Sequence, residues 1–225
     1  MFNQRLLVFF FFFGLCAITP FAAAEPLPPN EIKALLGRIH EKHTAAPHVQ
    51  KDFQEEKTLR MMNKPVLSSG KVWFQAPNKF RREVKGNSPS TAISDGQTLW
   101  IYYPKFQSAE RYSLGKRSPL DAGISALTAA LNLEGVEQTY NITGSREGNH
   151  YNLDLAPRTP SLKRLFQRFV IQFNDALQVN RTEMLQPNGD RIITNYTNES
   201  RTQIDPAIFQ FTPPPDTKIN TPLGR

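Results

Sequence analysis

Short stretches in which apolar and polar residues alternate recur along most of the chain. Val, Ile, Thr and aromatic residues occupy alternate positions, and breaks rich in Gly, Asn, Asp or Pro separate the stretches. Because successive side chains of a strand point to opposite faces of a sheet, this pattern predicts antiparallel strands joined by hairpins. The predicted strands cover residues 49–60, 65–75, 79–85, 91–94, 98–103, 109–114, 136–144, 150–155, 166–173, 177–185 and 191–198.

Two segments follow the helical period instead. Residues 30–42 and 118–133 each place apolar side chains on one stripe, and Asn30 is the predicted N-cap of the first segment. The stripes consist of Ile32, Leu35, Leu36 and Ile39, and of Leu120, Ile124, Leu127 and Leu131. Long antiparallel sheets curl or close. The pattern therefore predicts a mainly β (α+β) fold, a strongly curved sheet with helices over its concave face.

The beginning of the chain has the pattern of a cleavable export signal. Arg5 precedes an apolar run at 6–15, and small residues at 22–24 form a cleavage site. The run is shorter than the roughly 20 residues that a membrane-spanning helix needs. We therefore expect a signal peptide at 1–24, followed by one domain at 25–225 in the periplasm. Leu15 precedes Cys16, where a lipidated N-terminus has a small residue, so we expect no lipid anchor.

The residue composition and motifs limit the kinds of catalysis and ligand binding that the sequence predicts. Cys16 is the only cysteine and lies in the predicted signal, which excludes disulfides and thiol catalysis from the rest of the chain. The spacing of His40 and His43 is one residue short of the H-E-x-x-H motif of zinc proteases, so we predict no metal. No phosphate-binding glycine motif is present, and we predict no cofactor. A hydrolase would need two facing carboxylates, with Asp52, Glu55 and Asp121 as candidates, but nothing in their spacing favours it. We predict no catalytic residues.

A net charge of +7 favours anionic partners. A basic stretch with interleaved aromatics, Arg158, Lys163, Arg164, Phe166, Arg168 and Phe169, gives some support to nucleic-acid binding. A strand edge guarded by charge explains the same stretch, and an exported protein seldom meets nucleic acid, so we predict no nucleic-acid partner.

Broad apolar side chains are concentrated in the first half of the predicted sheet. Val72 and Phe74 share a face of one strand, as Trp100 and Tyr102 do of another. An ordinary core and a ligand cavity are both consistent with this pattern, because buried and ligand-contacting residues look alike in sequence.

Three motifs nevertheless occur in a characteristic order. Asp-Phe-Gln at 52–54 is followed by Gly-x-x-Trp-Phe-x-x-Pro-Asn-x-Phe at 70–80 and by Ser-Asp-Gly-x-x-Leu-Trp-x-Tyr at 94–102. With the tail at 204–214, they resemble the outer-membrane lipoprotein carrier family, LolA. The resemblance implies an incomplete β-barrel with a helical lid. It also implies a cavity for acyl chains, which we expect to be lined by Phe53, Val72, Phe74, Phe80, Trp100 and Tyr102 and covered by Leu35, Leu36, Ile39, Leu120, Ile124, Leu127 and Leu131.

The same resemblance implies partners. It predicts a monomer that receives acylated lipoproteins from an inner-membrane lipoprotein-releasing ABC transporter and delivers them to an outer-membrane lipoprotein receptor. The sequence departs from the family pattern at Ala76, where carriers have an Arg that ties the lid to the sheet. We hypothesise that Arg81 or Arg82 supplies this latch. The open alternatives are a paralogue that binds another lipid or glycolipid or senses lipoproteins, and a β-protein without a cavity.

Overall fold

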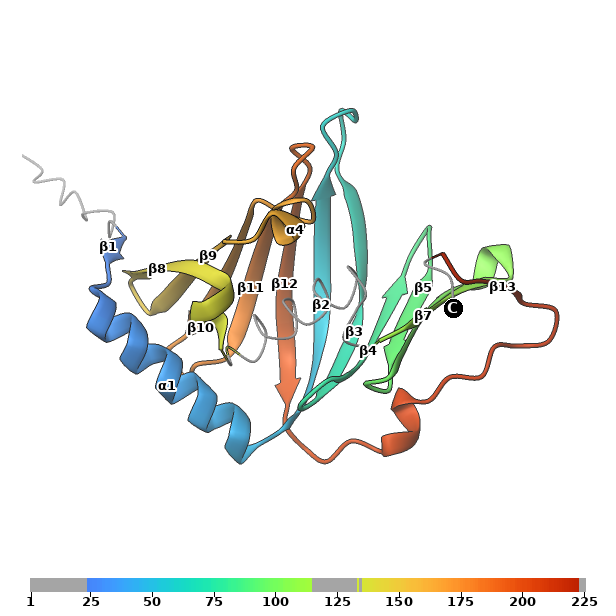
Figure 1. Ribbon diagram of the computed structural model, residues 1–225, viewed down its shortest axis with the longest axis horizontal. Coiled ribbons are helices and arrows are strands. Elements are labelled where there is room, and N and C mark those ends of the chain that lie inside the picture. The colour runs from blue at the N-terminus through green and yellow to red at the C-terminus, as the bar shows by residue number, and fades with distance from the viewer. Residues whose placement is uncertain (1–23, 115–132, 134, 223–225) are drawn as a thin grey trace, which may run out of the picture.

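The computed structural model describes residues 24–114, 133 and 135–222. Within them the chain forms one large curved sheet, ordered β1-β8-β9-β10-β11-β12-β2-β3-β4-β5-β6-β7-β13 (Figure 1). The order runs from β1 to β13 without closing, so the expected incomplete barrel is confirmed as an open sheet. The strands are β1 (Glu25–Pro26), β2 (His48–Thr58), β3 (Val66–Gln75), β4 (Lys79–Lys85), β5 (Ser90–Ser94), β6 (Thr98–Tyr103), β7 (Ser108–Ser113), β8 (Tyr140–Glu147), β9 (His150–Pro157), β10 (Arg168–Asn174), β11 (Val179–Leu185), β12 (Arg191–Ser200) and β13 (Lys218–Asn220).

The alternating pattern places most of these strands within one or two residues of their predicted bounds. Two expectations are corrected. Residues 136–139 form the short helix α3 (Val136–Thr139), which starts after Gly135 at φ 64°, a backbone angle that glycine adopts readily. The three prolines at 213–215 predict the end of regular structure, but β13 follows them and pairs in parallel with β7.

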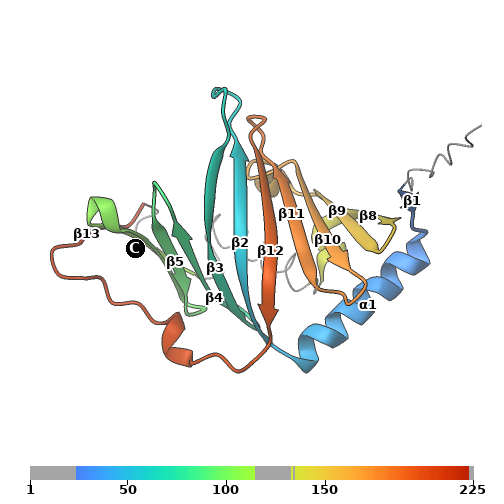
Figure 2. The same ribbon diagram turned by 180° about the vertical axis from the view of Figure 1, so that it is seen from behind.

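Helix α1 (Pro29–Ala45) covers one face of the sheet over β8, β9 and β10 (Figure 2). Leu35, Leu36 and Ile39 are buried as predicted. They form a core with side chains from the sheet, α3 and the short helix α4 (Pro160–Lys163), among them Tyr140, Leu153, Leu155, Leu162, Phe169, Ile171 and Phe173. The predicted Asn30 cap is wrong, because the helix starts earlier, after Pro28. Among the described residues no helix is long and apolar enough to cross a membrane.

The second predicted helix, 118–133, lies outside the described residues except for Leu133, which is buried in the core under α1. Leu120, Ile124, Leu127 and Leu131 lie outside them too. We call the side of the sheet that α1 covers the helix face, and the other side the outer face.

The outer face is covered near β4, β5 and β6 by the segment that follows β12 (Figures 1 and 2). This C-terminal segment includes the 3-10 helix η2 (Pro206–Phe209), and Phe209 is 2% exposed. Arg81 of β4 donates a hydrogen bond of 3.1 Å to the carbonyl of Ile208. The molecule therefore buries apolar side chains on both faces of the sheet, in different halves.

Candidate functional site

Strand register decides which of the predicted cavity residues share a face. Phe74 of β3 lies opposite Val49 of β2 and Phe80 of β4. Val72 lies opposite Lys51, two residues before Phe53, so all of them point to the helix face. The structure thus brings Phe53, Val72, Phe74 and Phe80 to one face, and their role in an acyl-chain cavity stays a prediction.

Trp100 and Tyr102 are not part of this group. The β4–β5–β6 pairings place Leu99 opposite Ser94, which lies opposite Phe80, so the neighbouring Trp100 points to the outer face. There its ring centroid lies 5.6 Å from that of Phe211, and the Tyr102 centroid lies 5.5 Å from it. These two aromatics hold the C-terminal segment on the sheet and do not line the pocket of the helix face.

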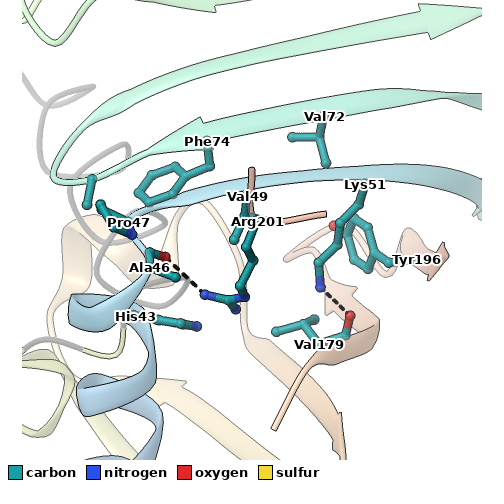
Figure 3. A pocket seen from close by; sticks show the side chains of 11 residues that line it. His43, Ala46, Pro47, Val49, Lys51, Val72, Phe74, Val179, Tyr196 and Arg201 are labelled. Carbon is teal, nitrogen blue, oxygen red and sulfur yellow. Dashed lines mark hydrogen bonds between the residues drawn. The ribbon is translucent and has the colours of Figure 1, made fainter. Parts of the chain in front are cut away.

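A pocket opens on the helix face where α1 ends (Figure 3). Its volume is about 110 Å³, below the roughly 300–1,000 Å³ of typical ligand sites. The walls are mostly apolar, and no carboxylate lines them. The lining residues are His43, Ala46, Pro47, Val49, Lys51, Val72, Phe74, Ala76, Val179, Tyr196 and Arg201. The pocket therefore joins two of the predicted cavity residues, Val72 and Phe74, to others that sequence reasoning missed.

Two basic side chains of the pocket meet a buried acid. The Nζ of Lys51 lies 2.8 Å from Oε2 of Glu199, and both side chains are only 7% exposed. Arg201 donates from Nε to Oε1 of Glu199 over 2.7 Å. Its second nitrogen donates to the carbonyl of Ala46, at the end of α1, over 3.1 Å (Figure 3). The ionic cluster Lys51–Glu199–Arg201 thus connects the end of α1 to the middle of the sheet.

A bulge in β12 brings Glu199 to this position. Thr197 pairs with Asp52 and Ser200 with Gln50, so an extra residue stands between them. Asn198 takes it up with φ 54°, a left-handed angle that Asn tolerates better than most residues, and donates to Asp52 over 2.7 Å. Without the bulge, Glu199 would point to the outer face.

Burial and ion pairing have opposite effects on the pKa values of Lys51 and Glu199. Burial lowers the pKa of Lys51, against the opposing effect of its hydrogen bond to Glu199. Burial alone would raise the pKa of Glu199, but the hydrogen bonds and charges of Lys51 and Arg201 outweigh it and hold that pKa below its ordinary value. Glu199 therefore stays ionised in the folded protein at neutral pH.

The pKa of Glu199 makes stability depend on pH. A carboxyl whose pKa is lower in the folded than in the unfolded protein binds fewer protons there, so its contribution is present above the unfolded pKa and is lost as pH falls through the folded one. The pKa of Glu183 is lowered in the same sense by its hydrogen bonds from Arg191. We expect the free energy of unfolding, measured with urea, to fall as pH drops below 4.5, the ordinary pKa of a glutamate carboxyl. Glu199→Gln should reduce this fall, and an unchanged profile in that variant would contradict it.

The two latch candidates lie on opposite faces. Arg82 lies on the helix face, where it donates to Oε2 of Glu55 over 2.6 Å and its guanidinium lies 4.2 Å from the Phe53 ring centroid. Arg81 lies on the outer face and binds Glu83 and Ile208. Neither of these contacts reaches α1. The latch hypothesis concerns the segment 118–133, so for Arg82 it stays a prediction, while Arg81 points away from the helix face.

The candidate catalytic carboxylates, metal ligands and base-stacking aromatics do not form a site in the described residues either. Asp52 and Glu55 are three apart on β2 and so point to opposite faces, and Asp121 lies outside the described residues. Within the described part of the chain no three His, Cys, Asp or Glu side chains are grouped as metal ligands. Phe166 and Phe169 are buried in the core under α1, so they are not available to stack on nucleic-acid bases.

An open, curved antiparallel sheet with an apolar pocket on its helix-covered face defines the structural class of this protein. Known proteins place the chain within that class. The family model of the outer membrane lipoprotein carrier protein LolA matches residues 45–212. The chain therefore belongs to the LolA family, and the sequence resemblance is confirmed.

Individual relatives are distant but cover most of the chain. The outer-membrane lipoprotein carrier protein of Edwardsiella ictaluri is 22% identical over 207 residues, which is 91% of this chain and 94% of that protein. The protein of the same name from Serratia proteamaculans is 23% identical, over 88% of this chain and 91% of its own. A conserved uncharacterised protein from Thermus thermophilus shares the fold, with a TM-score of 0.52 at 13% identity over 85% of this chain and 99% of that one. The Edwardsiella and Serratia relatives are lipoprotein carriers by name.

Proposed function

We propose that this protein is a periplasmic chaperone that binds the acyl chains of lipoproteins on the helix face and carries them from the inner to the outer membrane. The observation that supports it most is the apolar pocket beside Val72 and Phe74, in a chain that belongs to the LolA family. The proposal includes a cleaved signal at 1–24, a carrier domain at 25–225, and a monomeric working form.

A carrier is needed because each buried methylene contributes about 0.8 kcal/mol to membrane binding, so a protein with several acyl chains does not leave a bilayer unaided. The pocket is small as it stands, so acyl chains would have to widen it. The end of α1 borders it, and two basic side chains hold it there: Arg201 donates to the Ala46 carbonyl and Lys42 to the Ala176 carbonyl. Displacement of this end would enlarge the apolar surface. The proposal includes loading by an inner-membrane ABC transporter and delivery to an outer-membrane receptor, as the resemblance to the family implies.

A second candidate is a carrier of another envelope lipid. Ala76 lines the pocket where the family pattern has an Arg, so the pocket offers more apolar wall than that pattern implies. The same pocket would serve both kinds of cargo, so only the bound molecule distinguishes them.

The test is to identify that molecule. The protein, expressed with its own N-terminus in a Gram-negative host and isolated from the periplasm, is expected to carry acylated proteins detectable by mass spectrometry. The control is a host lipoprotein whose acylated cysteine is replaced by serine, which should not copurify. Free lipids alone would favour the second candidate, and an empty protein in repeated preparations would reject both.

A further inference from the structure

The loop between β2 and β3 exposes apolar side chains that are not part of the pocket on the helix face. We call residues 59–67 the hairpin tip. It extends beyond the neighbouring hairpins of the sheet in both views (Figures 1 and 2). Met61 is 98% exposed, Leu67 70%, Met62 50% and Val66 43%. Four adjacent or nearly adjacent apolar residues on a projecting loop make an unpartnered patch, and such patches mark contact sites.

The hairpin tip itself carries two cations and no acid, while Glu56 of β2 lies opposite Leu67 at its base. Arg60 and Lys64 belong to the hairpin tip and are exposed. No carboxylate of the described residues forms an ion pair with either, whereas Arg191 and Arg168 at the nearby strand ends pair with Glu183 and Asp154. An anionic partner would therefore meet Arg60 and Lys64 without first displacing an acid.

Strand register brings two further cations to the same end of the sheet. Thr58, just before the tip, pairs with Arg191, which pairs with Leu185, which in turn pairs with Arg168. Lys163 and Arg164 lie shortly before Arg168, at the end of α4, and are exposed. The basic stretch noted in the sequence thus lies at the end of the sheet from which the tip projects, although its aromatics are buried.

The tip is also held in place. Oδ1 of Asp190, in the β11–β12 turn, accepts a hydrogen bond of 2.9 Å from the backbone nitrogen of Arg60. This contact fixes the base of the tip against the neighbouring turn and leaves Met61 and Met62 pointing into solvent. A fixed apolar loop loses less conformational entropy on insertion than a mobile one would.

We propose that the hairpin tip inserts into the surface of an anionic lipid bilayer. Met61, Met62 and Leu67 enter the boundary between head groups and acyl chains, while Arg60, Lys64, Lys163 and Arg164 contact lipid phosphates. One anchoring element alone binds a membrane only marginally, whereas an inserted apolar group together with a basic patch binds it stably. The convex shape of the tip and the single sign of its charge suit a bilayer surface better than a protein groove. Such contact would place the carrier beside a membrane independently of a receptor.

Vesicle cosedimentation of the full protein tests this. We expect binding to vesicles of phosphatidylcholine and phosphatidylglycerol, and much weaker binding to phosphatidylcholine alone. Met61→Ser with Met62→Ser should lower partitioning by at least roughly ten-fold. Lys64→Gln should lower it by roughly five-fold, and added salt should remove this difference. The matched control is Phe106→Ser, because Phe106 is 75% exposed but lies beside β7 at the far edge of the sheet.

Equal losses in the Phe106 variant and the tip variant, or no preference for anionic vesicles, would overturn the proposal. So would tip variants that bind vesicles normally but lose an association with a membrane protein or with a second copy of the chain. Cargo binding separates this proposal from the carrier function, because the tip variants should still copurify with acylated cargo. A pocket variant such as Phe74→Asp should still bind vesicles.

Discussion

Replacement of Glu199 by Ala is expected to lower the free energy of unfolding by about 3–5 kcal/mol, the cost of removing one partner from a buried ionic cluster. The variant leaves the Lys51 ammonium buried without its acid, and Arg201 loses the carboxylate that positions it. Because Arg201 also binds the Ala46 carbonyl, the end of α1 should loosen at the same time. Urea unfolding measures the first effect, and hydrogen exchange at the end of α1 measures the second.

The matched control is Glu183→Ala. Glu183 pairs with Arg191 over 2.6 Å, but their side chains are 25% and 47% exposed, and exposed pairs contribute about 0–1 kcal/mol. A double variant, Lys51→Met with Glu199→Leu, should recover part of the loss, since it leaves no buried ammonium, although Arg201 still lacks its carboxylate. Equal effects of Glu199→Ala and Glu183→Ala would show that the cluster is not buried in solution.

Phe74→Asp should reduce acyl-chain binding by at least a hundred-fold. Phe74 lies in the pocket wall on the helix face, and a carboxylate there would have to be desolvated by any acyl chain. That desolvation costs roughly 3 kcal/mol or more, which corresponds to about two factors of ten in the dissociation constant. Titration with a fluorescent fatty acid and copurification of acylated cargo both measure the loss.

The control for this variant is its neighbour on the strand. Trp73→Asp introduces the same charge one residue earlier on β3, but Trp73 points to the outer face, where it pairs with Arg81 in the sheet. We expect this variant to keep its affinity for acyl chains. Similar losses at the two positions would mean that acyl chains do not bind on the helix face, and unchanged binding in both would place the acyl site outside the pocket.

The sequence by itself determined most of the strands, the position of the first helix and the class of fold. Apolar alternation is local, and so are the turns at residues 86–89 and 187–190, which is why β4 ends and β12 begins at its predicted residue. The stripe Leu35, Leu36 and Ile39 correctly predicted a buried helix face. These features depend on neighbours in the chain, so they can be read without knowing which strands pair.

The composition of the pocket depended on pairing between distant strands. Alternation tells which residues of one strand share a face, but the faces of different strands are related only by register. Trp100 therefore seemed equivalent to Phe74, although the β4–β5–β6 pairings turn it to the other side, against Phe211. A Lys at position 51, between Val49 and Phe53 on one face, was the available signal for a buried charge, and it was missed.

The buried ionic cluster around Glu199 was decided by tertiary structure alone. The bulge at Asn198 reverses the face of Glu199, and no local pattern announces it. The contacts of Arg201 join residues 155 positions apart in the chain. A buried charge is stable only when oppositely charged side chains are buried beside it. Here those side chains lie on strands that pair only in the assembled sheet. The local chain thus specified the strands, and the assembled sheet specified which side chains meet.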